Sequence, residues 1–143
     1  MSLDPYATAT KGVKDALLAI VKTTTTFSTH AYAHYIQKVT GNPTAFVRLR
    51  NDSFQAVGPK ETYHRYEFSI QINYRGSYTE SSLDAIIGYV GEIVDVIEAD
   101  RNLSSAYVES TEIKNVDYTF REAQQAVFHY AYISVEVTGL RNM

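Results

Sequence analysis

One segment constrains the fold of this 143-residue chain more than any other: "HRYEFSIQINYRG", residues 64–76. Because successive side chains of a β-strand point to opposite faces, its alternation predicts one long strand with two different faces. The apolar face requires a core and comprises Tyr66, Phe68, Ile70, Ile72 and Tyr74. The polar face comprises Arg65, Glu67, Ser69, Gln71, Asn73 and Arg75. Three roles are open for it: contact with water, with a substrate or with another copy of the chain.

Two segments carry apolar residues at helical spacing. The first, residues 5–23, is predicted to begin with Asp4 as the N-cap and Pro5 at the first helical position. The second is predicted to begin at an S-x-x-D signal formed by Ser81 and Asp84. An apolar stripe then continues for four turns through Leu83, Ile86, Ile87, Val90, Ile93, Val94 and Ile97.

The segments between the two predicted helices are less regular. Residues 27–39, "FSTHAYAHYIQKV", fit either a strand or an irregular segment, and we favour a strand. After a turn signal at 41–43, residues 44–50 predict a short strand with Val47 and Leu49 on one face. Residues 51–61, "NDSFQAVGPKE", carry turn formers and little periodicity, which predicts a long exposed loop.

Two strands are predicted at the C-terminal end, at about 106–120 and 125–138, and they should form a hairpin. In the last strand, Val127, Ala131, Ile133, Val135 and Val137 share one face with His129 among them. Phe128, Tyr130 and Tyr132 occupy the other face. Two helices can cover only one face of a sheet, so this aromatic cluster requires a different cover.

This order of elements predicts an α+β fold. We expect a two-layer sandwich with a mainly antiparallel sheet of four or five strands and two helices packed on one face. The length suits a single domain spanning 1–143. With 45% hydrophobic and 20% charged residues, the composition is that of a chain that folds.

Composition also narrows the class of function. A net charge of −3 provides no general attraction to nucleic acid or anionic lipid. Since cysteine is absent, there is no disulfide framework and no thiolate nucleophile. No signal peptide is predicted, because the N-terminal segment "MSLDPYATATKG" lacks the basic-then-apolar pattern. No membrane span is predicted, because Glu92 and Asp95 interrupt the most apolar segment. Twelve Tyr and six Phe suit surfaces that are half buried or that meet a partner.

No catalytic, cofactor-binding or metal-binding residue is predicted, and the chain is not expected to be an enzyme. His30 and His34 have the spacing of two metal ligands, but no third ligand can be named, so surface or interface histidines are favoured. Motifs for an activated serine or for phosphate binding are absent. Arg48, Arg50, Arg65 and Arg75 could form a basic stripe for single-stranded nucleic acid. Glu67 stands in the same row, which favours a mixed-charge face.

The order of segments resembles the tail terminator (tail completion) proteins of long-tailed bacteriophages. The resemblance lies in the first helix, "TGNPTAFVRLRND", the loop, "YHRYEFSIQINYRG", "LDAIIGYVGEIVDVI", "DRNLSSAYVES" and "AVFHYAYISVEVTGL". It extends from about residue 5 to 140 in element order, element length and strand texture, and it includes no invariant motif.

The resemblance implies a structural virion protein. Such proteins form a hexameric ring that caps the tail tube, stops tail elongation and provides the surface for head attachment. The implied partners are further copies of the chain, the tail tube protein and a head–tail connector or neck protein, with only passive contact with DNA. The implied location is the tail or neck of the virion, after assembly in the host cytoplasm. It implies no cofactor and no membrane.

A ring would use a different patch on each side of a subunit and would cover the surplus sheet face. The predicted subunit-interface residues are Phe128, Tyr130, Tyr132, Arg65, Glu67, Gln71 and Arg75. The predicted loop residues for contact with the tube or the connector are Asn51, Asp52, Phe54, Gln55 and Lys60. Two alternatives remain: another neck or head-closure protein, and an oligomeric small-molecule-binding protein or enzyme. Whether the polar strand face meets a neighbour or lines a wet channel is also open.

Overall fold

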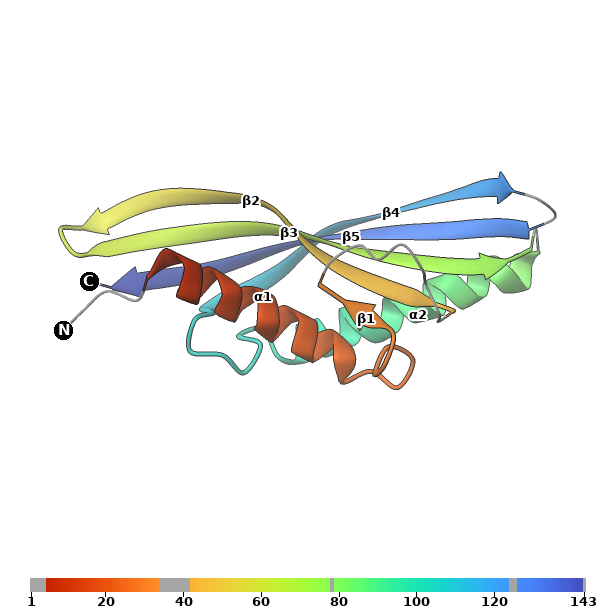
Figure 1. Ribbon diagram of the computed structural model, residues 1–143, viewed down its shortest axis with the longest axis horizontal. Coiled ribbons are helices and arrows are strands. Elements are labelled where there is room, and N and C mark those ends of the chain that lie inside the picture. The colour runs from red at the N-terminus through yellow and green to blue at the C-terminus, as the bar shows by residue number, and fades with distance from the viewer. Residues whose placement is uncertain (1–4, 34–41, 78, 124–125, 143) are drawn as a thin grey trace.

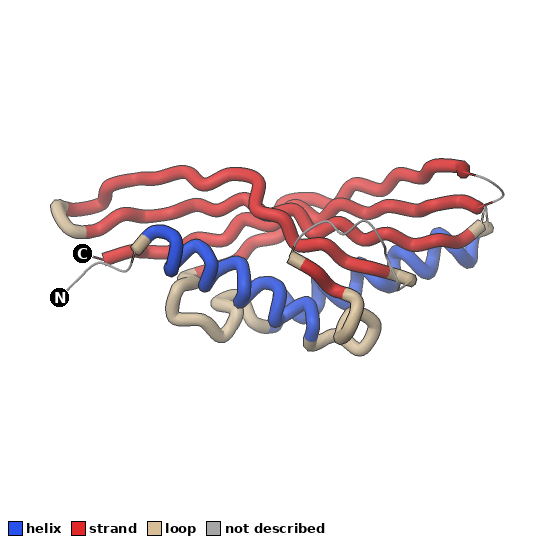
Figure 2. Tube along the Cα trace, viewed as in Figure 1, coloured by secondary structure: helices blue, strands red, loops and turns tan. Residues whose placement is uncertain are grey.

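The protein is an elongated two-layer molecule, as Figures 1 and 2 show for the computed structural model. The structure describes residues 5–33, 42–77, 79–123 and 126–142. In chain order the elements are α1 (Tyr6–Lys22), β1 (Ala31–Tyr32), β2 (Thr44–Gly58), β3 (Glu61–Gly76), α2 (Glu80–Ala99), β4 (Ser110–Ala123) and β5 (Ala126–Asn142). Both helices lie on one face of a single sheet, which confirms the predicted α+β fold.

The sheet has five strands in the order β1-β2-β3-β5-β4. All neighbours pair antiparallel except β1 and β2, which are parallel. The β2–β3 hairpin lies at one end of the molecule and the β4–β5 hairpin lies at the other (Figure 1). The long alternating segment is β3, which pairs with β2 on one side and with β5 on the other.

The core lies between the sheet and the helices, where the alternation of β3 predicts it. Tyr66, Phe68, Ile70 and Ile72 are buried, and they pair in register with Val137, Val135, Ile133 and Ala131 of β5. From the helices, the core receives Val13, Leu17, Val21, Ile86, Val90, Ile93 and Ile97. Tyr74 is half buried, with its ring 5.4 Å from that of Tyr89 in α2. The predicted apolar face of the long strand is thus confirmed.

The prediction of a loop at 51–61 is wrong. These residues form the outer half of the β2–β3 hairpin: β2 continues to Gly58, and β3 begins at Glu61. A register shift between Leu49 and Asn51 changes which residues face the helices. Val47 and Leu49 stand opposite Ile70 and Phe68, but after the shift even-numbered residues take the same face. The alternation is interrupted there, so the segment has no clear period.

A second register shift, between Ile113 and Asn115, has the same effect in β4. Ile113 faces Val135 before the shift, and Tyr118 and Phe120 take that face after it. The predicted hairpin of the last two strands is confirmed, with β4 beginning later than expected.

The boundaries of the N-terminal elements differ in detail from the predictions. The α1 helix is confirmed; Pro5 stands at its N-cap position, and Asp4 lies outside the described residues. The N-cap of α2 is Thr79, two residues before the predicted cap Ser81, because the Thr79 hydroxyl accepts a hydrogen bond from the Ser82 backbone N–H at 3.2 Å. Within 27–39, only Ala31–Tyr32 form a strand, and residues 34–39 are not described.

Tyr107 is wedged between α1 and β5 in the connection before β4. A Cβ added at Gly12 would lie 2.5 Å from Cδ2 of the Tyr107 ring. A Cβ added at Gly139 would lie 2.6 Å from the Tyr107 carbonyl oxygen. Glycine at these two positions therefore allows the connection to pack directly against the helix and the strand.

Candidate interaction surfaces

The helices are too short to cover the whole sheet. At about 1.5 Å per residue, the 20 residues of α2 span about 30 Å, whereas the 16 residues of β3 span about 50 Å at about 3.3 Å per residue. The β2–β3 hairpin extends beyond α1, whereas the first turns of α2 reach the end of the β4–β5 hairpin (Figure 1). Apolar side chains on the helix side of the sheet are exposed at both ends of the molecule, because Phe54 of β2 is 60% exposed and Phe120 of β4 is 58% exposed.

The first exposed surface lies on the arm, which we define as residues 50–65 at the outer half of the β2–β3 hairpin. Phe54 is 60% exposed and Val57 is 49% exposed. The Phe54 ring lies on the helix side, because Phe54 pairs in register with His64. Its centroid is 4.6 Å from the His64 ring and 5.7 Å from the Tyr6 ring at the start of α1. The arm thus presents an aromatic side chain on β2, supported by β3, which pairs there with both β2 and β5.

A buried pair of polar side chains braces the base of the arm. His64 Nδ1 lies 3.0 and 3.2 Å from the two carboxylate oxygens of Asp52. The two side chains are only 1% and 6% exposed, and the His64 ring stacks on Tyr66 at 5.4 Å. This contact joins β2 to β3 just after the register shift, so it fixes how the two strands of the arm lie against each other.

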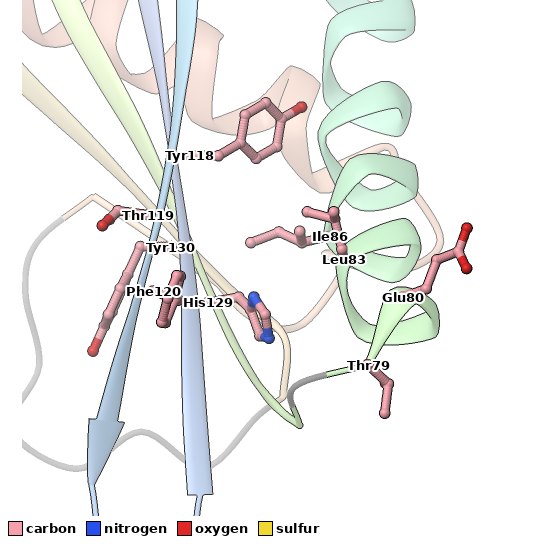
Figure 3. Close-up of a pocket in the computed structure, with 9 residues that line it drawn as sticks. All are labelled: Thr79, Glu80, Leu83, Ile86, Tyr118, Thr119, Phe120, His129 and Tyr130. Carbon is pink, nitrogen blue, oxygen red and sulfur yellow. The ribbon is translucent and has the colours of Figure 1, made fainter.

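The second exposed surface is an open groove of about 350 Å³ between the first turns of α2 and the outer part of the β4–β5 hairpin (Figure 3). It is lined by Thr79, Glu80, Leu83, Ile86, Tyr118, Thr119, Phe120, His129 and Tyr130. Tyr118 and His129 point toward α2, and Leu83 and Ile86 point back toward the strands, while Glu80 points away (Figure 3). Leu83, Tyr118 and Phe120 are between 44% and 58% exposed. We call this feature the α2–β4 groove.

His129, at the floor of the groove, is a structural residue. Its ring is buried, and its Nε2 donates a hydrogen bond to the Ser77 carbonyl oxygen at 2.9 Å. This bond ties β5 to the segment that leads into α2. His129 therefore lies in the helix-facing row of β5, as the alternation of that strand predicts.

The predicted subunit-interface residues lie together on the face of the sheet opposite the helices. Gln71 pairs in register with Tyr132, and Arg75 with Phe128. The three aromatic residues of β5 are half buried, whereas Arg65 and Glu67 are exposed. Gln71 is buried and donates a hydrogen bond to the Asn73 side-chain oxygen at 2.8 Å. Of this predicted set, Tyr130 also lines the α2–β4 groove.

This outer face carries charges of both signs. Glu136 lies 3.9 Å from Arg65 and 3.9 Å from Lys114, and Lys114 lies 3.1 Å from Glu112. Ion pairs at this exposure contribute little to folding. The mixed-charge interpretation of the face fits this arrangement better than a continuous basic stripe does.

The five residues predicted for tube or connector contact lie on the arm, but they differ in accessibility. Asn51, Gln55 and Lys60 are exposed, and so is Phe54. The Asp52 side chain is buried against His64, so its observed role is inside the arm.

The described residues include no cluster of three or more histidine, aspartate or glutamate side chains that could hold a metal ion. His30 is half buried with its Nδ1 shielded, and His34 lies outside the described residues. Glu92 of α2 accepts a hydrogen bond from the Thr26 hydroxyl at 2.6 Å. Burial raises the pKa of the Tyr89 phenol, and the neighbouring Tyr74 and Glu92 raise it further. Neither of the two described helices is long and apolar enough to cross a membrane.

Comparison with known proteins places the chain in no family. No family model and no curated protein matches its sequence. Among solved structures, a chain from the virion of a native gene transfer agent particle is similar over 92% of this chain and 91% of that chain. The TM-score of that pair is 0.43, at 10% sequence identity, and we draw no conclusion about function from it.

The groove was not predicted from the sequence. One half of the sequence signal for the groove is the apolar stripe of α2, which begins at Leu83, one turn before the first buried apolar residue of the helix. The other half of the signal, Tyr118 and Phe120 at alternate positions, could be aligned with the helix only once the register shift in β4 was known.

Proposed function

We propose that this chain is a tail terminator-like structural protein of a phage-type virion. In this proposal, copies of the chain form a ring of six that caps the tail tube, stops tail elongation and provides the surface for head attachment. The protein assembles in the host cytoplasm and remains at the tail or neck of the virion. Its partners are the tail tube protein and a connector or neck protein, and DNA passes through the ring without specific contacts.

The observation that carries this proposal is the pair of exposed apolar surfaces at opposite ends of one elongated molecule. Phe54 and Val57 on the arm, and Leu83 and Tyr118 in the groove, are each more than 40% exposed. An exposed apolar patch of this kind is typical of a protein interface. Two different patches on one chain favour a heterologous contact, which closes into a ring when the rotation between neighbours allows it.

The assignment of this ring to a tail terminator rests on the resemblance in element order. The buried polar side chains are consistent with a structural role. Within the described ranges, the buried histidines are engaged in packing or hydrogen bonds: His64 contacts Asp52, and His129 contacts Ser77. Asp52 is buried together with His64 and holds β2 to β3, and His129 bonds to a backbone carbonyl oxygen, so both histidines have structural roles. These roles favour binding of other proteins over catalysis.

The remaining predicted residues take roles on the other surfaces of the ring. We assign Asn51, Gln55 and Lys60, which are exposed on the arm, to contact with the tube or the connector. The outer sheet face with Arg65, Glu67, Gln71, Arg75, Phe128 and Tyr132 then either meets a neighbouring subunit or lines the channel. Its mixed charges suit a wet surface along which DNA passes without being held.

The direct test is capping of tail tubes. The tube protein encoded by the same virus would be polymerised alone and with the purified chain, and the products examined by electron microscopy. We expect a ring on one end of each tube and an arrest of tube growth. Binding to the portal side of a filled head, with no effect on tubes, would favour the head-closure alternative and refute a terminator.

A further inference from the structure

We propose that the arm of one copy docks into the α2–β4 groove of the next copy, with Phe54 entering between α2 and β4. This inference rests on the proposed function only in assuming that copies of the chain assemble with one another. It specifies which two surfaces meet, and it holds for any ring that this chain forms, whether or not the ring caps a tail tube.

The arm and the groove have complementary apolar side chains. The arm presents one aromatic and one β-branched apolar side chain, Phe54 and Val57, both about half exposed or more. The groove has space of about 350 Å³ between an apolar helix face and two aromatic side chains, Tyr118 and Phe120. An aromatic residue inserted in a pocket with aromatic walls is typical of the energetic centre of a protein interface.

The net charges around the arm and around the groove are of opposite sign. Basic residues are prominent on the arm, which carries Arg50, Lys60 and Arg65 together with one exposed carboxylate, Glu61. The end of the molecule that holds the groove is acidic. Its exposed charged residues are four carboxylates, Glu80, Asp84, Asp117 and Glu122, and two arginines, Arg75 and Arg121. The α2 helix itself includes five carboxylates and no basic residue. Opposite charges around two apolar surfaces steer them together and disfavour arm–arm or groove–groove contacts.

The positions of the two surfaces allow a contact only between different copies. The arm and the groove belong to hairpins at opposite ends of the molecule (Figure 1), so an arm cannot reach its own groove. Phe54 and Tyr118 nevertheless lie on the same side of the sheet, since each pairs in register with a residue of the helix-facing row. Each copy therefore offers one donor surface and one acceptor surface, as a closed ring requires.

Cysteine cross-linking tests the contact, because the natural chain contains no cysteine. The variant Val57→Cys/Thr119→Cys places one thiol on the arm and one at the groove, both at exposed positions. With a short bis-maleimide, we expect a ladder of covalent oligomers on a denaturing gel that ends at the subunit number of the ring. Each single-cysteine variant should remain monomeric on the same gel. The control Ala19→Cys/Thr119→Cys, with the first thiol on the exposed face of α1, should give no ladder.

A second pair of variants tests the role of Phe54 within that contact. Phe54→Asp in the double-cysteine background should abolish the ladder, because a carboxylate would enter an apolar and acidic groove. Ser53→Asp, on the opposite face of the same strand, should leave the ladder intact. Circular dichroism of both variants checks that they fold.

The possible outcomes separate this contact from the proposed function. If electron microscopy finds rings but the Val57→Cys/Thr119→Cys variant gives no ladder, the arm–groove contact is wrong and the ring remains. Cross-linking that stops at dimers also overturns it, because it would indicate a symmetric contact between two copies. If the ladder forms but the rings do not cap tail tubes, the contact is correct and the terminator function is wrong.

Discussion

Replacing Phe54 with alanine should weaken assembly strongly while changing the fold little. A phenylalanine side chain exposes about 200 Å² when free, so the 60% that remains exposed at Phe54 corresponds to about 120 Å². If the groove of the next copy covers this area, the contact gains about 3 kcal/mol at about 25 cal/mol per Å². Alanine retains the Cβ, so we expect a loss of about 2–3 kcal/mol per contact, or roughly 30- to 150-fold in the association constant.

Sedimentation velocity over a concentration series measures this effect. The Phe54→Ala chain should require roughly 30- to 150-fold more protein than the natural chain to reach the same degree of assembly. Gln55→Ala is the matched control, because Gln55 is the next residue of the arm, is exposed, and has its side chain on the other face. If Phe54→Ala assembles at the same concentration as the natural chain, Phe54 does not lie in the subunit contact.

Three further predictions concern stability and titration. Asp52→Ala should lower the free energy of unfolding in urea by about 1–3 kcal/mol, because it leaves a buried imidazole nitrogen without its partner. The double variant Asp52→Ala/His64→Phe should recover most of that loss, and equal stability of the two variants would contradict the role of the Asp52–His64 contact. Gly139→Ala should lower the free energy of unfolding by about 1–3 kcal/mol, because the added Cβ would clash with a backbone oxygen. Gly88→Ala in α2 should raise it by about 0.5–1 kcal/mol, because the added Cβ meets nothing within 4 Å. A gain in stability at both sites would rule out the clash at Gly139. Since the pKa of Tyr89 is raised in the folded state, the folded chain retains a proton that the unfolded chain has lost, so stability should fall as pH rises above about 10 and on through the folded pKa. Tyrosinate absorbance would be measured against pH for the natural chain and for Tyr89→Phe. The natural chain should show one additional phenol that titrates late, and identical titration curves would show that the pKa of Tyr89 is not raised.

The layers of the fold are predictable because period and length are local properties of the sequence. The alternation of residues 64–76 identifies β3 and its buried row, and the spacing from Ile86 to Ile97 identifies the buried stripe of α2. The outer half of β2 is not predictable in this way. It lies beyond the helical layer, so both of its faces tolerate polar residues, and the register shift after Leu49 removes the period of two.

The interaction surfaces were predicted less completely than the fold, because they depend on relative position. The sequence identifies Phe128, Tyr130 and Tyr132 as a surplus aromatic face, and it places Phe54 in an exposed segment. It cannot indicate that the first turns of α2 lie across from the outer part of β4, which is what forms the groove beside Tyr130. The buried partner of His64 was also missed: Asp52 was assigned to a loop, and no local pattern joins residues of two strands across a register shift.

We propose that this chain forms a closed ring through a heterologous contact, and the mass of the assembled protein distinguishes such a ring from other states. Native mass spectrometry of the purified full chain, with negative-stain images of the same sample, measures the subunit number and the shape together. We expect one dominant species of six copies with an open centre. A monomer at every concentration, or a symmetric dimer that grows no further, would contradict it.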